Sequence, residues 1–189
     1  DDYQDAAFVG QVFNVTNAEK AELKGAEAEG KVLLGENVTA DFGISYADFT
    51  YDEYTAGLCY AGRTPDGSMP GTCDLSGEHP LNAPEWTTHL GLMYETDVSW
   101  GDVYARADWS WTDESNTSYA ADPRLTYSWL NFRVGTHWEN YELVAWVDNA
   151  LDEEVVNVDA TLNLFSNDKS YHSFRQPPRS YGLTVRAQF

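Results

Sequence analysis

The sequence predicts an all-β fold built from long antiparallel strands. Apolar and polar residues alternate with a period of two in several runs, whereas helical spacing and helix-capping patterns are hard to find. In the cleanest run, Val38 to Tyr46, every even-numbered residue is apolar and every odd-numbered residue is small or polar. One face of such a strand meets an apolar environment and the other meets water.

About eight strands are expected, most of them longer than the roughly five or six residues usual in a globular sheet. They cover residues 3–14, 22–34, 38–46, 86–94, 103–111, 130–138, 141–149 and 181–189. The connections alternate in length. Residues 35–37, 97–101 and 139–140 are tight turns, whereas 55–83, 112–124 and 150–178 are longer. Turns at one end and loops at the other are typical of an up-and-down sheet that crosses a membrane, because only one side needs an elaborate surface.

The side chains at the two faces and at the strand ends favour the same interpretation. Aromatic residues gather near strand ends, where two interfacial girdles would hold them: Tyr46, Phe49, Tyr51, Tyr54, Trp86, Trp109, Trp111, Tyr127, Trp129 and Trp138. The polar face carries ionisable and amide groups: Asp41, His89, Arg106, Asp108, Asn131, Arg133, His137, Arg186 and Gln188. In a dry core these groups would require partners, whereas a water-filled barrel interior accepts them. The alternative is a soluble sandwich with an aromatic core.

The composition and the absence of known motifs argue against several classes of function. The 189 residues include 31 acidic and 11 basic ones, so the net charge of −20 argues against nucleic-acid binding. No run approaches the roughly 18 apolar residues of a transmembrane helix, and residues 1–4 carry no secretory signal, which is absent or was removed. No catalytic motif occurs and the four histidines share no metal-ligand spacing, so we expect no enzyme, no metal site and no cofactor. Acidic loops such as 152–154 nevertheless offer oxygen ligands for Ca²⁺.

The two cysteines, Cys59 and Cys73, lie 14 positions apart in a segment rich in Gly, Pro, Ser and Asp. We expect a disulfide that staples this loop, with two unpaired thiols as the alternative. Such a bond persists in an oxidising compartment.

Four stretches of the sequence resemble the C-terminal part of the barrel of a TonB-dependent outer-membrane receptor. Residues 17–29 and 34–46 are similar to the family's "NAGKAxxxGxExE" strand, its turn and the returning strand. Residues 81–95 are similar to "PNAPxWxxxxGxxYE", residues 146–155 to "VxNLFDExY" and residues 178–189 to "PRxYGLxxxxxF". The third departs from the pattern, because Ala150 and Leu151 stand where Leu and Phe are usual.

The resemblance implies a barrel of about twenty-two strands, of which residues 1–189 are the last part, with the plug and earlier strands in sequence absent from this chain. The terminal Phe189 looks like the signal that the barrel-assembly machinery reads. The implied protein resides in the bacterial outer membrane and imports a scarce nutrient when TonB pulls the plug. The nutrient would be siderophore-bound iron, a cobalamin-like molecule or an oligosaccharide.

The residues expected to contact this ligand lie in or near the long loops. They are Tyr51, Tyr54, Tyr60, Arg63, Tyr119, Arg124 and Tyr171, chosen as hydrogen-bond donors and stacking groups. Two other interpretations stay open at this point: a standalone outer-membrane barrel of about eight strands, and a secreted carbohydrate-binding β-sandwich.

Overall fold

The structure is a computed structural model of the chain. It describes residues 3–9, 12–59, 63–115, 126–161 and 171–189. Thirteen strands occur in these residues: β1 (Tyr3–Val9), β2 (Val12–Ala18), β3 (Lys20–Leu33), β4 (Val38–Glu53), β5 (Gly57–Leu58), β6 (Thr72–Cys73), β7 (Trp86–Val98), β8 (Gly101–Thr112), β9 (Tyr127–Trp138), β10 (Tyr141–Asp148), β11 (Val156–Thr161), β12 (Tyr171–Arg175) and β13 (Ser180–Ala187). The predicted all-β class is confirmed.

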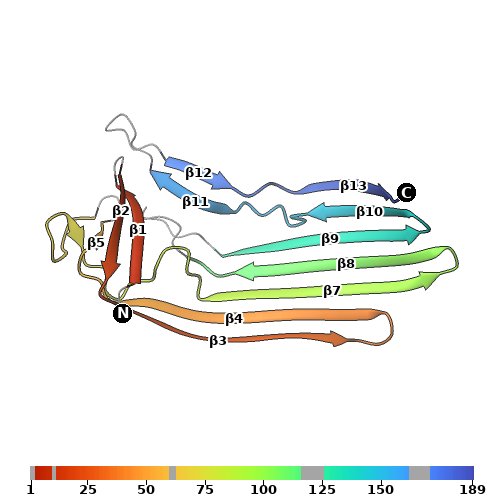
Figure 1. The fold of residues 1–189 in the computed structure, drawn as a ribbon, viewed down its shortest axis with the longest axis horizontal. Helices are drawn as coiled ribbons and strands as arrows, with labels where there is room; N and C mark the ends of the chain where they lie inside the picture. The colour runs from red at the N-terminus through yellow and green to blue at the C-terminus, as the bar shows by residue number, and fades with distance from the viewer. Residues whose placement is uncertain (1–2, 10–11, 60–62, 116–125, 162–170) are drawn as a thin grey trace.

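Seven of the strands form one open antiparallel sheet, in the order β13-β10-β9-β8-β7-β4-β3 (Figure 1). From β3 to β10, each strand pairs with the previous strand of this sheet, as in an up-and-down arrangement. The two edges of the sheet are β3 and β13. Closure into a cylinder is not seen among the described residues.

The three tight turns all lie at one end of the sheet, and the long connections lie at the other (Figure 1). At the turn end, Gly35 has a φ of 101°, a left-handed conformation that glycine adopts without steric cost. The predicted sorting of short and long connections is therefore confirmed. We call the two ends of the sheet the turn end and the loop end.

The predicted long connections contain additional strands, which was not expected from the sequence. The segment 55–83 holds the small β5–β6 pair, and the segment 150–178 holds the β11–β12 hairpin. The predicted strand 3–14 is also different, because it falls on two strands, β1 and β2, that pair with each other outside the main sheet. Residues 10–11 between them lie outside the described residues.

The buried apolar side chains lie at the loop end and not between layers of the sheet. Ala18, Tyr51, Tyr54, Cys73 and Leu75 form one cluster in which no side chain is more than 2% exposed. The large apolar side chains along the sheet itself stay open, for example Leu90 at 48% and Leu183 at 74%. The sheet is thus a single layer whose apolar face has no protein partner among the described residues.

Candidate functional site

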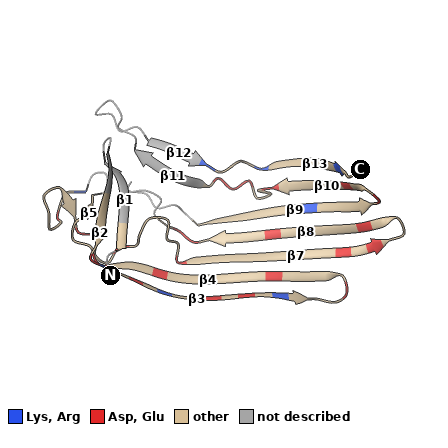
Figure 2. Cartoon of the chain, viewed as in Figure 1, with Lys and Arg blue, Asp and Glu red and all other residues tan. Residues whose placement is uncertain are grey.

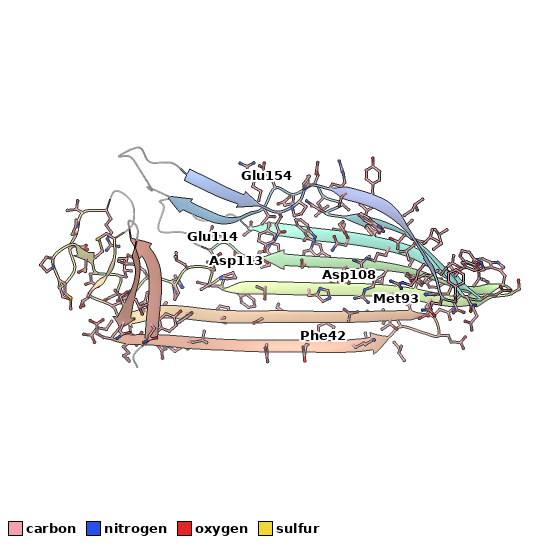
Figure 3. The ribbon with its side chains drawn as sticks, turned by 45° about the horizontal axis from the view of Figure 1, so that its top comes forward. Phe42, Met93, Asp108, Asp113, Glu114 and Glu154 are labelled. Carbon is pink, nitrogen blue, oxygen red and sulfur yellow. A yellow bond between two sulfur atoms is a disulfide. The ribbon has the colours of Figure 1, made fainter. Side chains whose placement is uncertain are left out.

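One face of the main sheet is continuously apolar across all seven strands. The register places alternate residues of neighbouring strands in shared rows, such as the row Gly30, Phe42, Leu90, Trp109 and Leu130. Phe42, labelled in Figure 3, is 45% exposed on this face. In the part of the chain that the structure describes, no helix is long and apolar enough to cross a membrane.

The apolar face has the height of a bilayer core. On β7 the outward run extends from Trp86 to Tyr94, and on β8 from Val103 to Trp111. Each run is close to the 9 to 11 residues that a tilted transmembrane strand requires. Aromatic rings mark both margins, with the Tyr46–Trp86 pair at the loop end (centroids 4.6 Å apart) and the Trp138–Tyr141 pair at the turn end (5.7 Å). Tyr and Trp prefer such interfacial levels.

The opposite face carries charged side chains, and several of them form two clusters of ion pairs. Arg106 is the centre of one cluster, 2.6 Å from Asp108 and 3.3 Å from Asp41. The His89 ring nitrogen lies 3.0 Å from the other oxygen of Asp41. Gly91 stands opposite Asp41, and a Cβ there would collide with the Asp41 carboxylate, so this glycine lets the carboxylate reach across β7 to Arg106. Asp108 is labelled in Figure 3, and Figure 2 shows the charges spread over several strands.

A second cluster on the polar face surrounds Glu142 of β10. Its carboxylate accepts a hydrogen bond from Arg186 at 2.6 Å, lies 3.2 Å from the His137 ring nitrogen and accepts from the Tyr104 hydroxyl at 3.4 Å. The Tyr104 ring lies over Gly135 on the next strand, where a Cβ would clash with it. The polar face therefore carries ion-paired and hydrogen-bonded charged side chains that are partly exposed, and it is not a buried core.

A single sheet with a bilayer-high apolar face, aromatic margins, a charged inner face, short turns and long loops is the wall of a transmembrane β-barrel of the outer-membrane type. In such barrels the turns are periplasmic and the long loops are extracellular. The loop end of this sheet is thus its extracellular end. The predicted water-filled interior and lipid-facing exterior correspond to the two faces described above.

The chain belongs to the TonB-dependent receptor family, since the family's β-barrel profile, described as "TonB dependent receptor-like, beta-barrel", matches residues 1–150. The fold is shared with the ferric yersiniabactin uptake receptor FyuA from Yersinia pestis (TM-score 0.68, 16% identity, 93% of this chain covered and 25% of FyuA). It is also shared with the siderophore receptor PiuA from Acinetobacter baumannii (TM-score 0.63, 16% identity, 88% of this chain and 22% of PiuA). A sequence comparison with curated proteins gives no significant match.

This chain therefore spans about a quarter of the length of these solved receptors. Family members reside in the bacterial outer membrane and are transporters rather than enzymes, so the predicted localisation and the predicted non-enzymatic class are confirmed.

The extracellular connection between β4 and β7 contains a folded unit, described for residues 54–59 and 63–78, which we call the loop unit. The predicted disulfide between Cys59 and Cys73 is present and holds β5 beside β6. Backbone hydrogen bonds tie the unit to the end of β4: the Tyr51 amide donates to the Glu78 carbonyl (2.9 Å) and the Gly77 amide donates to the Tyr51 carbonyl (2.6 Å). Within the unit, the Leu75 amide donates to the Tyr54 carbonyl (2.9 Å). These contacts bring Leu75 and Cys73 over the Tyr54 ring.

Two of the residues predicted to contact a ligand lie in the core of this unit. Tyr51 is 2% exposed and Tyr54 is 0% exposed, and their rings pack edge to face with centroids 4.8 Å apart. Sequence reasoning treated both as surface groups, but the structure gives them a packing role. A ligand could reach them only if the cluster opened, and that contact stays a prediction.

Arg63, the third residue predicted to contact a ligand, joins several parts of the loop unit by hydrogen bonds. Its guanidinium donates to the Glu78 carboxylate and the Asp74 carbonyl, both at 2.5 Å, and to Asp66 at 3.4 Å. The Asp74 amide donates to Asp66 and lowers the pKa of the Asp66 carboxyl, while the Ser76 hydroxyl and amide lower the pKa of Asp74. The hydrogen bond to Glu78 raises the pKa of Arg63.

The other predicted site residues are scattered or lie outside the described residues. Tyr60, Tyr119 and Arg124 belong to the segments 60–62 and 116–125, which are not described. Tyr171 is the first residue of β12. Phe189 follows the end of β13 and is fully exposed, and its role as an assembly signal stays a prediction.

The acidic loop 152–154 pairs with arginines in this structure. Asp152 lies 3.5 Å from Arg179 and also accepts the Arg179 amide at 3.0 Å, and Glu154 pairs with Arg175. Within the described ranges, no group of three or more His, Cys, Asp or Glu side chains is arranged to hold a metal ion. Ca²⁺ binding at the acidic loops remains an untested prediction.

A buried polar residue that sequence reasoning missed is Asn149, which is 0% exposed at the end of β10. Its amide group donates to the carbonyls of Glu153 (2.9 Å) and Pro177 (3.3 Å), and its carbonyl accepts the Glu153 amide (2.9 Å). The last of these acceptors, Pro177, directly precedes the stretch 178–189, so Asn149 joins the stretch 146–155 to the segment that leads into it. The sequence did mark both stretches, because each resembles a family motif. It could not show that Asn149 contacts Pro177, because the pattern of one segment does not identify a partner far along the chain.

Proposed function

We propose that residues 1–189 are the last part of the barrel of a receptor that imports a ferric siderophore across the outer membrane. The observation that supports this ligand class is the pair of structural neighbours, one named as a ferric yersiniabactin uptake receptor and the other as a siderophore receptor. The segment would supply the barrel wall and three extracellular connections. The remaining strands, the plug and the contact with TonB would lie outside residues 1–189.

Uptake and binding by the full-length receptor test the proposal. A strain that lacks the receptor gene is complemented with the full gene, and ⁵⁵Fe uptake is measured for a panel of ferric siderophores under iron limitation. We expect uptake of at least one chelate that is lost without the gene and lost when TonB is deleted. Cobalamin and oligosaccharides serve as the competing ligands, and uptake or binding of one of these in place of every chelate would refute the iron assignment.

A matched comparison within the chain examines the role of the loops. Replacing an exposed loop-tip residue, as in Met69→Ser, is compared with the wall substitution Met93→Ser on the polar face. Met69 is 62% exposed at the extracellular end, and Met93 lines a depression near the turn end. If the extracellular loops contact the ligand, affinity for the transported chelate changes more in the first variant than in the second.

A further inference from the structure

Two large aromatic side chains of the polar face lie flat against the main sheet. Tyr104 of β8 and Trp146 of β10 lie on the same face as Glu142. The Tyr104 ring extends sideways over Gly135, its partner on β9, and the Trp146 ring extends over Gly182, its partner on β13. Side chains of a strand usually stand roughly perpendicular to the sheet. These two rings instead follow the sheet toward the next strand, among strands that run side by side in Figure 1.

Each ring can take this position because its partner is a glycine. A Cβ on Gly135 would collide with the ring of Tyr104, and a Cβ on Gly182 would collide with the indole of Trp146. Gly135 is the buried residue of β9, since the ring covers it. Glycine otherwise weakens a strand relative to alanine. The two glycines therefore have a steric reason to stand where they do.

Hydrogen bonds hold the polar end of each ring on the sheet. The Tyr104 hydroxyl donates to the Glu142 carboxylate of β10 at 3.4 Å, so this side chain spans the whole width of β9. The Trp146 indole N–H donates to the Thr184 hydroxyl of β13 at 3.2 Å. The Tyr104 ring also stacks on the His137 ring, with centroids 5.5 Å apart. Each ring is thus held both over its glycine and at its polar end.

With the rings flat, the polar face keeps a hollow of about 320 Å³ beside β10. Both rings line it, together with Val144 and Arg133. A Cβ at either glycine would force its ring into another rotamer, away from the sheet and toward this space. The cargo of a barrel transporter has to move along the polar face, because the apolar face meets lipid. The position of the rings therefore affects the room that is left for the cargo.

We propose that Gly135 and Gly182 are positioning residues for transport, which seat the Tyr104 and Trp146 rings against the sheet and so keep the interior open beside β9, β10 and β13. Neither glycine contacts the cargo, because each acts through the ring that lies on it. The inference rests on the transporter class of the family and not on a ferric siderophore as the cargo. Gly43 is the matched control, since a Cβ at this position of the same face meets no atom within 4 Å.

Thiol labelling of the full-length receptor in lipid vesicles tests the position of the ring without any cargo. Val144→Cys places a thiol in the hollow, and the two natural cysteines of this chain are bonded to each other. A charged methanethiosulfonate reagent is added, and mass spectrometry of the β10 peptide gives the labelling rate. We expect Gly135→Ala to slow labelling severalfold, because the ring turns into the hollow, and Gly43→Ala to leave the rate unchanged. Labelling that is equal in all backgrounds, faster in Gly135→Ala or absent throughout would overturn the proposal.

Uptake by cells tests the consequence for transport. The cargo is the molecule that the wild-type receptor takes up in the experiment proposed above, whether a ferric chelate, cobalamin or an oligosaccharide. A wrong siderophore assignment therefore shows in the choice of cargo and not in this comparison. We expect Gly135→Ala and Gly182→Ala to lower the maximal uptake rate per folded receptor severalfold and to leave the affinity for the cargo at the cell surface unchanged. Gly43→Ala should match the wild type in both quantities.

Removal of the ring separates its seating from a general loss of folding. Gly135→Ala combined with Tyr104→Ala should restore the uptake rate, because no ring is left to turn away from the sheet. The folded receptor is quantified by its heat-resistant barrel band on gels. Gly182→Ala combined with Trp146→Ala gives the same comparison if the first pair does not fold. Uptake that stays low without the ring, or wild-type uptake in both single alanine variants, would overturn the proposal.

Discussion

The main sheet, which we call the wall, and the loop unit differ in how their apolar side chains are covered. The wall leaves its apolar side chains open, with Leu90 at 48% exposure, and relies on lipid to cover them. The loop unit covers its own, with Tyr54 and Leu75 at 0% exposure, and adds a disulfide. The difference shows that the strands depend on the bilayer to cover their apolar side chains, whereas the loop unit forms a small apolar core of its own. Each region should therefore respond to a different kind of perturbation.

The largest expected effect lies in the core of the loop unit. Leu75→Ala removes a fully buried side chain that packs with Tyr54 and Cys73, and large-to-small core substitutions cost about 2–5 kcal/mol. We expect the loop unit to become sensitive to protease added outside intact cells, while the heat-resistant barrel band on gels is retained. Met69→Ala, at a 62% exposed position of the same unit, is the control and should stay resistant.

The wall should be most sensitive at mid-depth on its lipid face. Leu90 lies halfway along the outward run of β7, where an arginine costs about 2–4 kcal/mol. Leu90→Arg is expected to lower the stability of the barrel in lipid vesicles by this amount, as measured by denaturant titration. His89→Arg places the same side chain at the adjacent residue, on the opposite, polar face, and should lower the stability far less. Equal losses in the two variants would contradict the assignment of the faces.

Removal of the disulfide should act on the loop unit alone. Closing a loop of about 15 residues contributes roughly 3 kcal/mol in the chain-entropy model. The paired substitution Cys59→Ser with Cys73→Ser is expected to increase proteolysis within the loop unit and to leave the unfolding of the wall in vesicles unchanged. A loss of wall stability comparable to that of Leu90→Arg would mean that the two regions do not fold independently.

The smallest expected effect is a pH dependence of the loop unit. The pKa of Asp66 is lowered below its ordinary value of 3.8 by the Asp74 amide and by Arg63, so the carboxylate form is favoured in the folded loop. Its contribution is complete above the ordinary pKa and is lost as the pH falls through the lowered value. Protease resistance of the loop unit should decrease as the pH falls below 3.8, and Asp66→Asn should flatten that decrease. The wall should not follow this profile.

Much of the wall follows from local pattern. The alternation of Val38–Tyr46 places Phe42 and Ile44 on one face and Asp41 on the other, and the structure shows this arrangement. The number of strands in the sheet was harder to predict from the sequence, because the strand-like pattern of residues 3–14 does not show which strand they pair with. The structure pairs those residues with each other and removes them from the wall.

The packing around the candidate ligand-contact residues could not be predicted from the sequence. Tyr51 and Tyr54 have the amphipathic side chains that a binding surface uses, but Ala18 and Leu75 cover them from other parts of the chain. Arg63 donates to Glu78 and to the Asp74 carbonyl, and its contact with a ligand stays a prediction. Residue type alone does not distinguish a loop that presents its tyrosines from one that packs around them.

The sequence by itself determined the all-β class, the two chemically different faces and the end at which the loops lie. Each of these depends on a period of two or on turn residues, which are local properties of the chain. Only the tertiary structure decided the pairing of β1 with β2 outside the main sheet, the burial of the loop tyrosines and the hydrogen bond from Asn149 to Pro177. These features depend on contacts between distant segments, whose free energy is set by the packing they achieve together.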